Sequence, residues 1–96
     1  MSERPHFIVH NPGDSVGVVV VEDVKAGQEL TGWVMSNDDT IKLTVQADVP
    51  LGHKVATRPL AKSDTVIEYE HEIGRAIDDI PVGGYVHAHN IKTKRW

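Results

Sequence analysis

The stretch VKAGQEL, residues 24–30, places a glycine three positions after one apolar residue and three before another. The same outline recurs in VPLGHKV at residues 49–55 and in IPVGGYV at residues 80–86. LAKSDTV, residues 60–66, follows it with serine in the glycine position. Such a pattern favours a tight turn whose third residue has a positive φ, with apolar anchors at both ends. The starts at 24, 49, 60 and 80 keep no fixed period, so we expect one small all-β body and not a solenoid.

The segments between these turns have the composition of short strands, and glycine, proline and β-branched residues interrupt any helical stripe. Residues 16–21 are apolar without alternation, as in a strand buried on both faces. In residues 40–45 Ile41, Leu43 and Val45 share one face, which predicts the second arm of a hairpin. A short helical turn is expected near Ile73–Ile77. Strands are expected at residues 7–9, 16–21, 33–35, 40–45, 66–69 and 85–91.

Length and composition limit the class of protein. The chain of 96 residues allows one domain, with a core that is thin. It has no cysteine, which excludes disulfides, thiolate metal sites and a thiol nucleophile. Its 14 acidic and 10 basic residues give a formal charge of −4, which argues against a nucleic-acid partner. The longest apolar run, residues 16–21, is too short to span a bilayer and no signal peptide is evident, so we expect a cytoplasmic protein without a membrane partner.

His87 and His89 form the first candidate site. On an extended strand, residues two apart project from the same face, about 6–7 Å from each other. Two imidazoles in that arrangement can share one divalent metal or bind one anionic ligand. A His-x-His pair is a weak signal by itself. The alternative is a polar strand that faces solvent and has no chemical role.

His53 and Lys54 form the second candidate site. They follow the glycine of the turn at 49–55, so a possible acid or base lies beside a fixed positive charge. That pair suits a carboxylate or sulfonate ligand, and the alternative is a solvated loop. In residues 10–15 we expect Asp14 to cap a turn, the alternative being that it accepts a hydrogen bond from a histidine. Glu68, Glu70 and Glu72 are expected to form an exposed charged edge and are not assigned to a site.

Together these groups do not make a complete active site. The sequence contains no serine or cysteine triad, no phosphate-binding glycine loop and no recognisable set of three metal ligands. Three histidine-containing turns nevertheless occur in one short chain. We therefore expect an incomplete site, to which another polypeptide supplies the remaining groups.

Three segments carry a family resemblance: Val49–Ala56 (VPLGHKVA), Ile73–Ala76 (IGRA) and Val86–Asn90 (VHAHN). Together with Val9–His10 and Asp14–Val18, they resemble the N-terminal domain of the altronate and galactarate dehydratases. That domain is of the SAF type, with a β-clip fold. The resemblance implies a single mostly β domain over residues 1–96, with short strands, tight glycine turns and little helix. Its ordered core would span about residues 7–91, and residues 92–96 would form a basic C-terminal tail.

The resemblance also implies a function. The chain would be the small subunit of a two-component carbon–sulfur or carbon–oxygen lyase that acts on a small anionic hydroxy acid. The partner would be a large catalytic subunit of the same family. This subunit would supply the general base and would be the main holder of a divalent metal ion, expected to be iron. The isolated chain would be inactive.

Roles for single residues follow from the same resemblance. Lys54 would stabilise a substrate anion, and His53 would act as a ligand or proton carrier. His87 and His89 would bind substrate oxygens or contribute to the metal, and Asn90 would bind substrate or orient a histidine. Two alternatives stay open: the small subunit of a sugar-acid dehydratase acting on altronate or an aldarate, and a stand-alone SAF binding module without catalysis.

Overall fold

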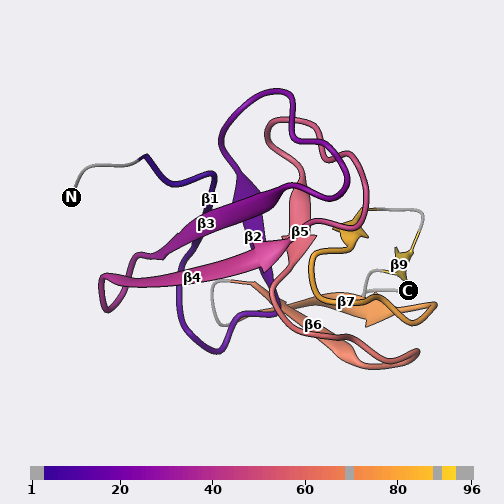
Figure 1. The fold of residues 1–96 in the computed structure, drawn as a ribbon. Helices are drawn as coiled ribbons and strands as arrows, with labels where there is room; N and C mark the ends of the chain where they lie inside the picture. Colours follow the sequence, from indigo (N-terminus) through magenta and orange to yellow (C-terminus); the bar gives the residue numbers. More distant parts are fainter. Residues whose placement is uncertain (1–3, 69–70, 88–89, 93–96) are drawn as a thin grey trace.

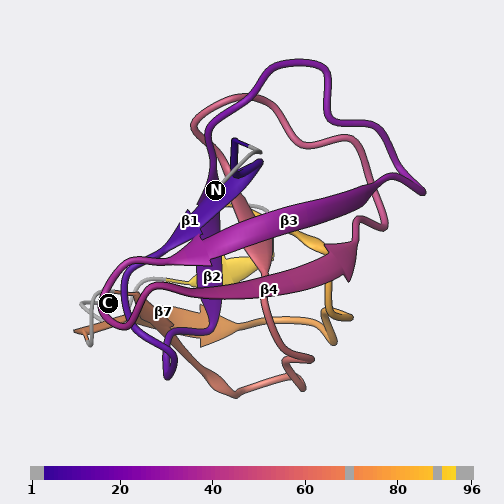
Figure 2. The same cartoon turned by 60° about the vertical axis from the view of Figure 1, so that its left-hand side comes forward.

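The computed structural model describes residues 4–68, 71–87 and 90–92, and within them the chain forms nine strands and no helix. The strands are β1 Phe7–Val9, β2 Val16–Val19, β3 Glu29–Val34, β4 Asp39–Thr44, β5 Lys54–Ala56, β6 Thr65–Glu68, β7 His71–Ala76, β8 Tyr85–Val86 and β9 Ile91–Lys92. A six-stranded sheet has the order β4-β3-β1-β2-β5-β8, and a three-stranded sheet has the order β6-β7-β9. β6 and β7 of the smaller sheet lie below the strands of the larger one (Figure 1, Figure 2). The expected all-β fold is confirmed.

All four predicted turns are present. Their third residues, Gly27, Gly52, Ser63 and Gly83, have φ values of 90°, 86°, 78° and 83°. In each turn the N–H of the following residue donates to the carbonyl three residues earlier, at 2.9–3.1 Å, as in a type II turn. The N–H of each positive-φ residue donates at 2.7–2.8 Å to a carbonyl at or next to the end of another strand. Each turn therefore satisfies a carbonyl at or next to the end of another strand, in addition to reversing the chain.

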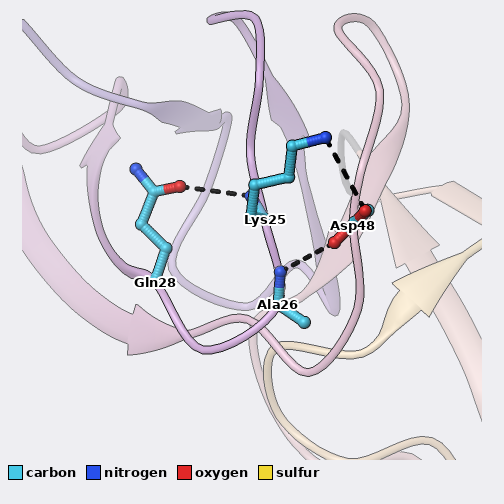
Figure 3. Close-up of polar contacts among 4 residues, drawn as sticks. All are labelled: Lys25, Ala26, Gln28 and Asp48. Carbon is cyan, nitrogen blue, oxygen red and sulfur yellow. Dashed lines mark hydrogen bonds and ion pairs between the residues drawn. The ribbon is translucent and has the colours of Figure 1, made fainter.

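The first two turns are joined to each other. Val24 and Val49 form an isolated antiparallel bridge, which brings the two loops side by side at the top of the molecule (Figure 1). Figure 3 shows Oδ1 of Asp48 accepting a hydrogen bond from the N–H of Ala26, at 2.9 Å. Oε1 of Gln28 accepts from the backbone N–H three residues earlier, at 3.2 Å. Backbone N–H groups that have no partner within the turn are thus hydrogen-bonded by side chains of the two paired turns.

The third and fourth turns repeat this arrangement. Leu60 and Ile80 form the second isolated antiparallel bridge. Oδ1 of Asp79 accepts from the N–H of Lys62 at 2.8 Å, and Oδ2 of Asp64 accepts from the N–H three residues earlier at 2.8 Å. In both pairs an aspartate directly before the bridge residue binds the partner turn. The turn pattern in the sequence therefore marks an internal structural repeat.

Two hydrophobic clusters fill the molecule, and β2 and β5 contribute to both. Val19 and Val55 are fully buried in the first cluster, while Val16 and Ala56 are buried in the second. The prediction of a strand buried on both faces is confirmed for residues 16–19, although Val20 is 38% exposed. Since neighbouring side chains of β5 enter different clusters, the residues that precede them also face opposite sides.

The predicted hairpin is β3–β4, but the predicted helical turn near Ile73–Ile77 is wrong. Ile73 lies in β7, which pairs with β6 on one side and with β9 on the other. The buried residues of β7 are Gly74 and Ala76, and such small residues give no hydrophobic alternation that would mark a strand. None of the described segments forms a helix long and apolar enough to cross a membrane.

The predicted strand over residues 85–91 is also wrong. β8 ends at Val86, and β9 begins at Ile91 in the other sheet. Between them the chain turns, with the N–H of Asn90 donating to the carbonyl of His87 at 3.0 Å. The argument that His87 and His89 share one face of a strand therefore does not apply. His89 lies outside the described residues, as do Tyr69, Glu70 and residues 93–96 of the expected tail.

Candidate functional site

Three rings gather where β8 meets β5: those of His53, Tyr85 and His87. The hydroxyl of Tyr85 lies 2.5 Å from Nδ1 of His53. The ring centroids of the two histidines are 4.6 Å apart, and the rings of Tyr85 and His87 are stacked at 5.7 Å. His87 is exposed and the other two rings are half-buried. The structure thus brings two of the predicted site histidines together, 34 residues apart in the sequence, at the surface of the domain.

The local structure explains why these rings meet. His53 ends the turn that begins at Pro50, and its carbonyl accepts a hydrogen bond from the N–H of Val19, at 2.9 Å. Tyr85 lies opposite Val55 in the β5–β8 ladder, so it is on the same side of the sheet as His53. A shallow groove of about 260 Å³ borders Tyr85 and is otherwise lined by the first pair of turns. The cluster is therefore open to a ligand or to a partner surface.

Asn90 supports this cluster from below the surface. Its Oδ1 accepts from the N–H of His87 at 2.9 Å, and its Nδ2 donates to the carbonyl of Tyr85 at 2.6 Å. The residue is 9% exposed. Both ends of the amide are engaged by the backbone on either side of Val86. Of the two roles expected for Asn90, the geometry favours orienting a histidine.

Lys54 does not join the histidines. Alternation along β5 sends Lys54 to the side of Ala56 and the second hydrophobic cluster, opposite to His53. There its Nζ lies 3.9 Å from Oε1 of Glu68 in β6. The Lys54 side chain is 34% exposed and that of Glu68 is 13% exposed. The second predicted pair is therefore divided between two faces, and Lys54 is part of a contact between the two sheets.

Glu68 was expected on an exposed charged edge, but this prediction is wrong for Glu68, whose side chain is 13% exposed. Burial raises the pKa of its carboxyl above the ordinary value of 4.5; the nearby Lys54 ammonium lowers this pKa in part, and Asp14 raises it further. Asp14 is 2% exposed and lies in the loop before β2. The adjacent Ser15 accepts through Oγ from the N–H of Ile67 at 3.2 Å, which ties this loop to β6. A carboxyl in this position loses its charge more readily than an exposed one.

The raised pKa of Glu68 predicts how stability depends on pH. From pH 4.5 up to its folded-state pKa, this carboxyl binds more protons in the folded chain than in the unfolded chain, so its contribution to the free energy of unfolding falls as pH rises. In urea denaturation, the free energy of unfolding of Glu68→Gln relative to that of the wild type should therefore rise between pH 4.5 and pH 7. The exposed Glu29→Gln should show no such trend. A wild-type advantage that grows across this window would contradict the prediction.

The loop over residues 10–15 is a turn, as the preferred interpretation held. The N–H of Asn11 donates to Oδ2 of Asp14 at 3.3 Å, and the N–H of Asp14 donates back to the carbonyl of Asn11 at 3.0 Å. Thr57 and Arg58 bind the carbonyls of Asp14 and Gly13, at 2.9 and 2.8 Å. These contacts hold the loop onto the chain that follows β5.

The described residues do not form a metal site by themselves. Across residues 4–68, 71–87 and 90–92, no three histidine, aspartate or glutamate side chains gather closely enough to hold an ion. One nitrogen of His53 is also engaged by Tyr85. The predicted contribution of His87 and His89 to a metal stays a prediction.

Tyr85 was missed in the sequence because it occupies an ordinary position of the turn pattern at 80–86. Nothing local relates it to His53, which lies 32 residues earlier. Glu68 was missed because it opens a row of alternating glutamates that resembles an exposed edge. A signal for Tyr85 exists only after the turns at 49–55 and 80–86 are aligned as strand neighbours.

Comparison with known proteins places this geometry in context. A model of the altronate/galactarate dehydratase SAF domain matches residues 5–94. The (2R)-sulfolactate sulfo-lyase subunit alpha of Chromohalobacter salexigens is 56% identical over 90 residues, which cover 94% of this chain and 96% of that subunit. The corresponding subunit of Paracoccus pantotrophus is 52% identical over 63 residues, 66% of this chain and 94% of its own. Altronate dehydratase of Bacillus subtilis is 31% identical over 91% of this chain, but over 16% of its own length.

Proposed function

This chain belongs to the altronate/galactarate dehydratase SAF domain family, and we propose that it is the small subunit of a two-component sulfolactate sulfo-lyase. The observation that carries this proposal is the 56% identity that extends over 96% of a sulfo-lyase alpha subunit. The match to altronate dehydratase covers 16% of that longer chain. This chain thus corresponds in length to the separate small subunit.

The proposed reaction requires a base and groups that stabilise negative charge. A base removes the proton from the carbon that carries the hydroxyl and the carboxylate of sulfolactate. Its electron pair forms a carbon–carbon double bond, the carbon–sulfur bond breaks, and sulfite leaves. The resulting enol tautomerises to pyruvate. Negative charge grows on the carboxylate during proton removal, so fixed positive charge and hydrogen-bond donors accelerate this step.

The surface rings supply part of this machinery. We assign His53 to proton transfer or ligand binding, and His87, together with His89, to substrate oxygens or to a contribution to the metal. Asn90 orients the cluster. The general base belongs to the large subunit. That subunit also mainly holds a divalent metal ion, for which we expect iron. A shallow, open site on a thin domain fits a cleft that is completed by that partner.

Lys54 has a conditional role in this proposal. Its ammonium can stabilise a substrate anion only if that anion replaces Glu68 as its neighbour. Because burial raises the pKa of Glu68, its carboxyl competes for the ammonium less than an exposed glutamate would. Because Lys54 and His53 lie on opposite faces, this role would place the anion at the contact between the two sheets and not at the rings of His53 and His87.

The proposal predicts that turnover requires both chains. Co-expression with a large subunit of the family should give a complex that releases sulfite and pyruvate from (2R)-sulfolactate, while each chain alone is inactive. Release of a keto acid from altronate without sulfite formation would instead identify a sugar-acid dehydratase. A chain that binds no large subunit would be a stand-alone binding module.

A further inference from the structure

Tyr85 has a relation to His53 that the proposed reaction does not yet use. We propose that Tyr85 is a positioning residue that sets which nitrogen of the His53 imidazole carries the proton, and how the ring is oriented. The contact that carries this inference is the 2.5 Å distance between the Tyr85 hydroxyl and Nδ1 of His53. Its consequence for turnover rests on the proposed function, whereas its effect on the imidazole does not.

The phenol is held in place on several sides. Tyr85 lies opposite Val55 in the β5–β8 ladder, and its ring packs against the first hydrophobic cluster. Its carbonyl accepts from Nδ2 of the buried Asn90 at 2.6 Å. A half-buried tyrosine has only two side-chain dihedrals to fix, so these contacts leave the hydroxyl in a defined place. The hydroxyl is therefore suited to orient a neighbour.

The backbone of His53 is held as well. Its N–H donates to the carbonyl of Pro50 at 3.0 Å, and its carbonyl accepts from the N–H of Val19 at 2.9 Å. The imidazole lies between two rings, that of Tyr85 with the centroid at 5.6 Å and that of His87 at 4.6 Å. What these contacts leave open is the position of the proton on the ring, which the hydroxyl of Tyr85 decides.

The chemistry of the two groups determines the outcome. A neutral imidazole has one N–H and one acceptor nitrogen, and a phenol hydroxyl can either donate to Nδ1 or accept from it. In the proposed arrangement the hydroxyl of Tyr85 donates to Nδ1, which leaves the N–H of His53 at Nε2. A protonated imidazole has N–H groups at both nitrogens, and the phenol oxygen then accepts from Nδ1. In both states Nε2 offers a donor. Tyr85 thus keeps His53 ready to bind a carboxylate or sulfonate oxygen whether the ring is charged or neutral.

The first test measures the imidazole itself. The full chain is labelled with ¹⁵N at histidine, and His53→Gln identifies the His53 signals in long-range ¹H–¹⁵N spectra. In wild type we expect neutral His53 to carry its proton at Nε2. In Tyr85→Phe, which keeps the ring and removes the hydroxyl, we expect both tautomers to be populated. Neutral wild-type His53 with its proton at Nδ1, or spectra of His53 that are unchanged in Tyr85→Phe, would overturn the proposal.

The second test measures turnover of the assembled complex. Tyr85→Phe should lower kcat/KM about 10–100-fold, the usual effect of losing a group that orients a functional histidine. Thr57→Val removes another half-buried hydroxyl, which donates to the carbonyl of Asp14, and should leave kcat/KM near the wild-type value. Turnover of Tyr85→Phe equal to wild type would also overturn the positioning role. If no lyase activity is found in any complex, the proposed function fails, and the spectra still decide the role of Tyr85.

Discussion

Gly83→Ala is expected to lower the free energy of unfolding by about 3–5 kcal/mol, because a Cβ at this position collides with backbone atoms. The added carbon would overlap the carbonyl oxygen of Thr44 and lie 2.9 Å from its carbonyl carbon. The φ of 83° adds the strain of a left-handed conformation, about 1–2 kcal/mol. The backbone of Gly83 cannot move away easily, since its N–H donates to Ala56 and its carbonyl accepts from Gln46.

The matched control is Gly52→Ala. Gly52 has almost the same conformation, with a φ of 86°, but a Cβ there would meet no atom within 4 Å. Only the conformational strain remains, so we expect a loss of about 1–2 kcal/mol. Urea denaturation of both full-length variants gives the two free energies. Equal losses would show that the collision at Gly83 is relieved and that the turn near Thr44 is not rigidly packed.

The contrast between these two glycines shows what the sequence can predict. The outline of an apolar residue, a glycine and a second apolar residue predicted both turns, because a positive φ is a local requirement. The sequence could not predict that Thr44 lies against Gly83 and that solvent lies beside Gly52. That difference depends on which strands are neighbours, and the two turns take equivalent places in different pairs.

Strand order was out of reach for a related reason. β8 contains two residues and β5 contains three, too few for any periodic pattern of apolar residues. β5 follows its turn so closely that the sequence pattern placed Lys54 in the turn at residues 49–55. Once β5 is known to be a strand, alternation separates Lys54 from His53 and leads it to Glu68. The division of the predicted site therefore follows from the three-residue strand β5, which carries no periodic signal of its own.

The family resemblance supplied what local patterns could not, namely that these turns belong to one SAF domain. It did not supply Tyr85, because a motif of matching segments does not state which side chains touch. His53 lies in one matched segment and His87 in another, and Tyr85 lies just before the second. The aromatic cluster is thus a product of the β5–β8 ladder, and its members must be tested in the assembled complex.

His87→Ala is expected to lower kcat/KM of the assembled complex by about 10²–10³-fold, the effect of removing a side chain that binds substrate charge or moves a proton. The variant is well suited to this test because His87 is exposed, so its removal leaves no cavity in either hydrophobic cluster. The hydrogen bonds of Asn90 to this segment use the N–H of His87 and the carbonyl of Tyr85, so both persist in the variant. A loss of turnover would therefore report on the site and not on folding.

His71→Ala provides the control, since His71 is an exposed histidine of β7 in the other sheet. We expect this variant to assemble with the large subunit and to release sulfite at the wild-type rate. Size-exclusion chromatography checks that both complexes form before their rates are compared. If His87→Ala forms the complex and turns over at the rate of His71→Ala, the His87 side chain has no part in the reaction.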